Sequence, residues 1–131
     1  MTQEDKELLL KDLCARSPYG VICAVNSHNE RLDSIDPFEE IATFGFQSFD
    51  VSEVKPYLRP MSSMTEEEHD ELFGTQHNTE MEEIKNSGDY LKASIIGDMA
   101  KYDWLNSHHF DYRGLIDKGI AIEAPEGMYK L

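Results

Sequence analysis

The chain has 131 residues, of which 40% are hydrophobic and 10% aromatic, so length and apolar content predict one folded domain and exclude disorder by composition. Its 26 acidic and 12 basic side chains give a formal net charge of −14, which argues against direct binding to nucleic acid or to an anionic membrane. That charge favours solubility, and it favours a basic protein or a cation as a partner.

The first residues do not resemble a secretion signal, because Glu4, Asp5 and Glu7 stand where a signal peptide carries cations. The longest apolar run is also far shorter than the roughly 20 residues that a membrane-spanning helix needs. A cytoplasmic protein is therefore predicted. Cys14 and Cys23 are too far apart for a CxxC redox or zinc unit, and both are expected to be small buried hydrophobes.

The first predicted element is a helix that ends near Arg16. Thr2 is a candidate N-cap, and Asp5 stands three residues later in the capping-box position. Ser17 and Pro18 stop the helix, since the residue before a proline disfavours helical geometry. The expected apolar stripe is Leu9, Leu10, Leu13 and Cys14, and the residues outside it are Lys6, Lys11 and Asp12.

Residues 21–35 predict a β-hairpin. The run from 21 to 25 is apolar on both sides and rich in β-branched residues, which is typical of a covered strand. Residues 26–29 have turn chemistry, and residues 30–35 supply the second strand before Asp36 and Pro37 break it.

A third strand is predicted within residues 38–49, with Gly45 at a bulge or a close backbone approach. Pro56 and Pro60 lie in residues 55–60, which are predicted to be a connection with one 3₁₀ turn. The residues assigned to the strand are Ile41, Thr43, Phe44 and Phe46, and those that continue the sheet are Val51 and Val54.

The region 65–83 combines a helix start with the densest charge of the chain. Thr65 is a candidate N-cap with Glu68 in the capping-box position, and acids in a first turn also favour the helix dipole. The region holds eight acidic residues and no Lys or Arg. It is interpreted as a solvated face, as a face for a basic partner, or as a loose cation site. The residues of that cation site are His69, His77, and Glu80 or Glu83.

Two further helices are predicted. The longer one runs from about Tyr90 to Ser107, and Gly97 inside it permits close packing on the sheet at roughly 1 kcal/mol relative to alanine. The shorter one covers 112–118, with Asp111 as its N-cap and Gly119 as its terminator. The stripe of the longer helix is Leu91, Ile95, Met99, Tyr102 and Leu105 or Asn106, and the buried side of the shorter one is Leu115 and Ile116.

These elements predict an α+β fold, with residues 1–131 as a single domain. The N-terminal helix packs on a small antiparallel sheet built from residues 21–54, for which a curled, barrel-like form is a variant. A helical section, 65–118, covers one face. A final short strand at 120–123 alternates apolar and polar residues, and it returns to the sheet or pairs with an edge.

The adjacent pair His108 and His109 is the first candidate for chemistry. On a regular helix the two side chains diverge by about 100°, so they can share a metal only from a loop, where Asp111 could join them. This alternative describes a small metal-dependent hydrolase, although Asp111 is better explained as an N-cap. The sequence has no P-loop, GxGxxG or GxSxG motif. No catalytic residue and no cofactor are therefore predicted, and an enzyme is the less favoured class.

Large aromatic residues with polar groups make the C-terminal region a candidate binding surface. Trp, Tyr and Arg are common anchors of interfaces, while aromatics beside apolar Leu115 and Ile116 are also typical of a core. The predicted binding residues are Trp104, His108, His109, Tyr112 and Arg113.

Three segments carry a resemblance: KELLLKDLCARSPYGV at 6–21, KPYLRPMSSMTEEE at 55–68 and WLNSHHFDYRGLIDKGIAIEAPEGMY at 104–129. They resemble a group of small acidic proteins of gut anaerobic bacteria, often encoded near prophage or other mobile-element genes. The resemblance departs at 26–50, where length and sequence are expected to vary. The group has no known activity, ligand or catalytic residue, so the resemblance transfers no site residue to this chain.

The sequence alone leaves the function unknown, with three hypotheses open. The first is a non-enzymatic interaction module whose acidic face docks a basic protein, with mimicry of nucleic-acid phosphates as an extreme form. The second is the metal-dependent hydrolase. The third is a structural or oligomeric domain, and the sequence does not determine the oligomeric state.

Overall fold

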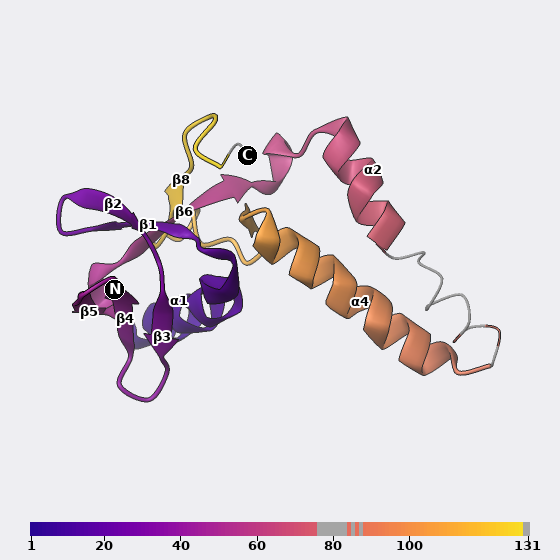
Figure 1. The fold of residues 1–131 in the computed structure, drawn as a ribbon, viewed down its shortest axis with the longest axis horizontal. Coiled ribbons are helices and arrows are strands. Elements are labelled where there is room, and N and C mark those ends of the chain that lie inside the picture. Colours follow the sequence, from indigo (N-terminus) through magenta and orange to yellow (C-terminus); the bar gives the residue numbers. More distant parts are fainter. Residues whose placement is uncertain (76–83, 85, 87, 130–131) are drawn as a thin grey trace.

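The computed structural model describes residues 1–75, 84, 86 and 88–129. Two small β-sheets lie beside one helix, and a pair of helices extends away from them (Figure 1). This is an α+β fold, as the sequence predicts. The described helices are α1 (Gln3–Arg16), α2 (Glu66–Thr75) and α4 (Tyr90–Ser107), with 3₁₀ turns η1 (Ser17–Tyr19), η2 (Val51–Glu53) and η3 (Met61–Ser63). The strands are β1 (Ile22–Val25), β2 (His28–Arg31), β3 (Ser34–Asp36), β4 (Ile41–Phe44), β5 (Gln47–Asp50), β6 (Lys55–Pro60), β7 (Phe110–Asp111) and β8 (Ile122–Glu123).

Helix α1 begins at the predicted capping box. The Asp5 backbone N–H donates to Thr2 Oγ1 at 3.1 Å, and the Thr2 N–H donates to Asp5 Oδ2 at 3.3 Å. Both bonds satisfy donors that a helix start leaves free. Two predictions about its faces are wrong, because Cys14 is exposed and Asp12 is fully buried. The buried face of α1 therefore includes a carboxylate, which needs an ion-pair partner.

The larger sheet has the order β2-β1-β6-β7, and β8 also pairs with β6. Strands β1 and β2 form the predicted antiparallel hairpin, in which Val25 pairs with His28. The two residues between these strands, Asn26 and Ser27, have φ angles of 44° and 74°. Positive φ at both positions matches the twist that a two-residue hairpin turn requires.

The predicted connection at 55–60 is instead β6, the central strand of the larger sheet. Proline removes a ladder N–H, so Pro56 and Pro60 argue against a central strand. The strand tolerates them because it pairs over only two residues with each neighbour: antiparallel to β1, and parallel to β7 and β8. Few N–H donors are needed along such a strand. This is a pairing between distant segments that local sequence does not reveal.

The smaller sheet is antiparallel, with the order β3-β4-β5. The sequence predicts one sheet over 21–54, whereas these three strands form a sheet separate from β1 and β2. Gly45 lies in the turn between β4 and β5 with a φ of 62°, so it serves a turn that L side chains rarely permit. Phe46, assigned to the third strand, is the other turn residue and is fully exposed.

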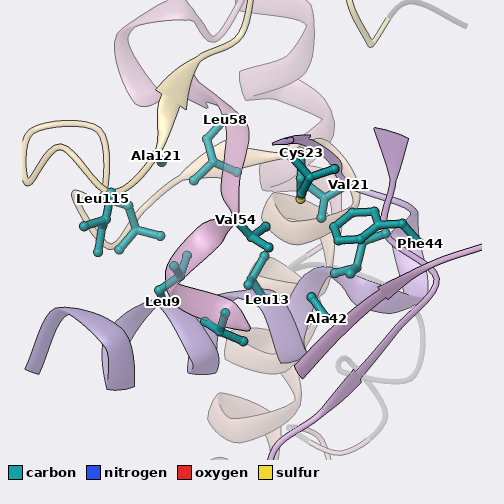
Figure 2. Close-up of a cluster of buried hydrophobic side chains, with 14 residues drawn as sticks. Leu9, Leu13, Val21, Cys23, Ala42, Phe44, Val54, Leu58, Leu115 and Ala121 are labelled. Carbon is teal, nitrogen blue, oxygen red and sulfur yellow. The ribbon is translucent and has the colours of Figure 1, made fainter. Parts of the chain in front are cut away.

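The main core lies between α1 and the strands (Figure 2). It is built by hydrophobic side chains, most of them aliphatic, from α1, β1, β4, η2 and β6, which are almost wholly removed from solvent. The C-terminal segment closes it with Leu115, Ile120 and Ala121. Other labelled members are Leu9, Leu13, Val21, Cys23, Ala42, Phe44, Val54 and Leu58.

The helices α2 and α4 extend beyond the sheets instead of covering one face of them (Figure 1). The α2 capping box of Thr65 and Glu68 is confirmed, with two bonds of 3.1 Å. The predicted apolar stripe of α4 exists, but most of it faces solvent. The exposed fractions are 74% for Leu91, 51% for Ile95, 60% for Met99 and 45% for Tyr102, while Leu105 is buried.

The opposite side of α4 is the buried one. It carries Ala93, Gly97 and Trp104, which recur at helical spacing. Ala93 and Gly97 are small, so Trp104, near the C-terminal end of the helix, is the one bulky side chain among these three. This explains why α4 joins the body of the protein at that end.

The predicted helix at 112–118 is wrong, because residues 112–114 form neither helix nor hydrogen-bonded turn and residues 115–119 form turns. Asp111 still caps them, since its carboxylate accepts the N–H groups of Leu115 at 2.9 Å and Ile116 at 3.0 Å. Gly119 follows with a φ of 75°. Beyond these turns, β8 covers the second half of the strand predicted at 120–123, and it pairs with β6, where Tyr57 lies opposite Ile122.

Candidate functional site

Trp104, one of the predicted binding residues, lies inside the structure. It is 7% exposed and is stacked between His108 and Phe110, with centroid separations of 3.9 Å and 5.8 Å. The His108 ring is fixed by its Nδ1, which lies 2.9 Å from the Trp104 carbonyl oxygen. Met64, which precedes α2, and Leu72 of α2 pack against this cluster and connect it to that helix. These rings fill a second small core.

The His109 side chain packs in a different place from that of His108, and the residue is 6% exposed. Its backbone has a left-handed φ of 63°, and its ring stacks on Tyr129 at 3.9 Å. The Tyr129 hydroxyl accepts from the Ile22 N–H at 2.9 Å and donates to the Tyr57 carbonyl at 2.7 Å. This stack therefore fastens the C-terminal segment to β1 and β6.

The predicted metal set, His108, His109 and Asp111, does not converge. The two histidine rings stack on different partners, and the Asp111 carboxylate is engaged by backbone N–H groups. Among the residues that the structure describes, no three His, Cys, Asp or Glu side chains are grouped to hold a metal ion. Of the looser cation set, His69 is exposed on α2, whereas His77, Glu80 and Glu83 lie outside the described residues.

The burial of His109 makes folding sensitive to acid. Burial lowers the pKa of His109 from 6.5 to about 4, and the Arg16 guanidinium acts in the same direction. Between these values the unfolded chain binds a proton that the folded chain does not. The free energy of unfolding should therefore fall by roughly 3 kcal/mol as the pH drops from 6.5 to 4.

We expect a His109→Asn variant to lose most of the decrease in unfolding free energy between pH 6.5 and pH 4. Asparagine is chosen because it tolerates the left-handed backbone at this position. Urea denaturation at intervals between pH 7 and pH 4 measures it for the parent and the variant. His28→Asn, at an exposed strand position, is the matched control and should keep the parental slope. Equal slopes for the parent and His109→Asn would contradict the assignment.

The remaining predicted binding residues, Tyr112 and Arg113, join a buried charged cluster that sequence reasoning missed. Asp12 and Arg16 are both fully buried, and Arg16 Nε donates to Asp12 Oδ2 at 2.8 Å. Arg113 Nε lies 3.4 Å from the other oxygen of Asp12. Both guanidinium groups lie over the Tyr112 ring, at 5.4 Å and 5.2 Å from its centroid.

This cluster locks α1 to the C-terminal segment. Arg16 Nη2 donates to the backbone carbonyl of Phe110, so one guanidinium holds two elements that are far apart in sequence. Burial raises the pKa of Asp12, and the Arg16 guanidinium opposes that shift. The available sequence signal was an Asp and an Arg four residues apart beside buried leucines, the spacing of a helical ion pair.

A hollow of about 400 Å³ lies near the β1–β2 hairpin and η2. None of the predicted binding residues lines it. Its polar lining side chains, such as His28, Glu53 and Lys55, are exposed at its rim. It therefore lacks the buried polar groups that orient a small molecule.

An ion pair helps to fix the inner side of α2 to the body, in addition to the packing of Leu72 against the Trp104 cluster. Arg59 of β6 donates two hydrogen bonds to the Glu68 carboxylate, at 2.7 Å and 2.6 Å, and its guanidinium lies 4.1 Å from the Phe110 centroid. The Arg59 hydrogen bonds lower the pKa of Glu68 to about 2. A bidentate pair of this kind sets orientation as well as energy. It determines which side of α2 faces outward.

The outward side of α2 is acidic and has an aromatic residue within it. Phe73 is 51% exposed, and its ring touches His69 at 4.6 Å. At about 100° per residue, Phe73 lies between His69 and the carboxylates of Glu66 and Asp70. None of the exposed acids of α2 forms an ion pair within the described part of the chain. The exposed acids are Glu66, Glu67, Asp70 and Glu71, and with Phe73 they are called the acidic face of α2.

Comparisons with protein-family models, with curated proteins and with solved structures gave no match. In the part of the chain that the structure describes, no helix is long and apolar enough to cross a membrane.

Proposed function

We propose that this chain is a non-enzymatic interaction module that binds a basic protein through the acidic face of α2. We place it in the cytoplasm and, following its resemblance to the gut bacterial group, assign it to a mobile element. The observation that carries the proposal is Phe73, a half-exposed aromatic ring on a helix whose other outward side chains are mostly carboxylates.

The acidic face of α2 is suited to binding cationic side chains. Glu66, Glu67, Asp70 and Glu71 leave four charges without a described ion-pair partner, so a basic segment gains attraction without breaking existing pairs. An arginine can stack its guanidinium on Phe73 while it donates to Asp70. Arginine should therefore be preferred to lysine, whose ammonium group is compact and strongly hydrated.

The test uses a fluorescent peptide of alternating arginine and leucine and a lysine version of equal length. We expect the full chain to bind the arginine peptide more tightly, and binding to weaken between about 50 and 300 mM salt. Neutralising the four acids of the face to Gln or Asn should weaken it about tenfold. Fluorescence anisotropy measures each affinity.

The matched control neutralises four exposed acids elsewhere: Glu7, Glu39, Asp117 and Glu126. It changes the net charge equally and should leave most of the affinity intact. Phe73→Ala should remove the preference for arginine while retaining the salt dependence. If the two charge variants lose affinity equally, attraction is diffuse and the acidic face of α2 is not the site.

A further inference from the structure

Helix α4 has a second apolar side that is largely exposed in the described structure, although Tyr102 at its C-terminal end also contacts the Tyr112 ring, with centroids 5.3 Å apart. Leu91, Ile95, Met99 and Tyr102 recur every three or four residues, so they form one stripe along about three turns of the helix. The buried residues Ala93, Gly97 and Trp104 lie on the opposite side. Continuous apolar surface of this kind usually marks a contact with another molecule.

The charges of α4 distinguish it from the rest of the chain. It carries two cations, Lys92 and Lys101, and two anions, Asp98 and Asp103, so its side chains are neutral in sum. The whole chain has a net charge of −14. A basic protein is therefore attracted to α2 more than to α4, whereas a second acidic molecule meets least repulsion at α4.

From this pattern we infer that the stripe of α4 pairs with the same stripe of a second copy, with the two helices antiparallel. A twofold axis at the level of Gly97 places Ile95 opposite Met99 of the second copy. The same axis places Leu91 beside Tyr102 of the second copy. Each apolar contact is made twice, as symmetry requires.

The flanking charges fit this register. Lys92 and Asp103 are both exposed, and they lie on the same edge of the stripe about three turns apart. In an antiparallel pair each edge meets the same edge of the other copy, so Lys92 comes next to Asp103 of the second copy. A parallel pair brings unlike edges together and does not form this contact.

One residue opposes the pairing. Asp98 lies close to the twofold axis and approaches its own symmetry copy, accompanied by Lys101, whose Nζ is 3.8 Å away. Four apolar side chains per copy also make a small interface, at the low end of specific contacts. The dimer should therefore be weak and reversible, and Asp98→Asn should strengthen it.

Sedimentation equilibrium of the full chain from about 1 µM to about 1 mM tests the inference. The parent should pass from monomer to dimer in this range. Ile95→Gln with Met99→Gln should weaken the dimer about tenfold, whereas Tyr90→Gln, an exposed aromatic of α4 outside the stripe, should leave it unchanged. Circular dichroism checks that each variant keeps its helices.

A charge exchange tests the register. Lys92→Glu and Asp103→Lys should each weaken the dimer, and the double variant should restore it. A parent that stays monomeric at every concentration overturns the inference. So does a dimer that ignores the Ile95 and Met99 substitutions, or a double variant that is weaker than either single one. Because the acidic face of α2 is separate, the Ile95 and Met99 variant should still bind the arginine peptide.

Discussion

Replacing Arg16 with methionine is expected to lower the free energy of unfolding by roughly 3–5 kcal/mol. The substitution keeps much of the side-chain length but leaves Asp12, which is fully buried, without its closest cation. It also removes the donor to the Phe110 carbonyl, which joins α1 to the C-terminal segment. Arg113 compensates only in part, because its Nε lies 3.4 Å from Asp12, farther than Arg16, and the side chain is 30% exposed.

Urea denaturation followed by circular dichroism measures this loss. Lys11→Met, on the exposed side of the same helix, is the control and should change stability by less than about 0.5 kcal/mol. Replacing Asp12 with leucine together with Arg16→Met should recover part of the loss, since no unpaired buried carboxylate remains. An Arg16→Met variant as stable as the parent would show that the buried pair is dispensable.

Trp104→Ala is the second large effect, with an expected loss of roughly 3–5 kcal/mol. The indole is 7% exposed and is stacked between His108 and Phe110, so its removal leaves a cavity between two rings. It also weakens the attachment of α4, whose remaining buried residues include the small Ala93 and Gly97. Loss of this anchor should therefore loosen both helices of the α2–α4 pair.

Thermal and urea unfolding measure the effect of Trp104→Ala. Tyr90→Ala removes an aromatic ring from the same helix at a position that is 71% exposed, and it should cost less than about 0.5 kcal/mol. Amide hydrogen exchange should show faster exchange across α4 in the Trp104 variant. Equal midpoints for the parent and Trp104→Ala would place the indole outside the stabilising core.

The sequence correctly predicted the elements that depend on residues close together in the chain. The capping boxes at Thr2 and Thr65 use side chains three residues away, and both are present. The β1–β2 hairpin was predicted from turn residues after an apolar strand, although the turn is confined to residues 26–27 of the predicted 26–29. These motifs depend on neighbours in sequence, so they can be predicted without knowledge of the fold.

The errors arise where distant segments determine the structure. Strand β6 contains Pro56 and Pro60, and it forms because three other strands pair with it over short stretches. Asp12 is buried because Arg16 and a residue near the C-terminus, Arg113, surround it. Residues 112–118 did not become a helix, although the capping role of Asp111 was predicted correctly. Local sequence shows the Asp12–Arg16 spacing, but it reveals neither Arg113 nor the strands that pair with β6.

The candidate site was likewise predicted only in part. The acidic helix was predicted from composition, and the structure adds that Glu68 faces inward while its neighbours face solvent. Phe73 was missed as a candidate. The sequence feature that could have identified it is the lack of apolar residues three and four positions earlier, where Asp70 and His69 stand. An aromatic residue without such neighbours on an acidic helix is a better candidate for binding than one within an apolar cluster.

The two proposals combine into one arrangement. If two copies pair through α4, the dimer presents two acidic faces of α2, and a partner with two basic segments could engage both. Linked binding of this kind raises the effective affinity without new contacts. The peptide used above engages one face at a time, so its affinity should not depend on dimerisation.

The most direct test of the central claim is an amide NMR titration of the full chain with the arginine peptide at about 50 mM salt. We expect the largest shift changes at residues 66–74 of α2, with Trp104, His108 and His109 unaffected because their rings are packed inside the structure. Changes concentrated at those three residues, with α2 silent, would contradict it.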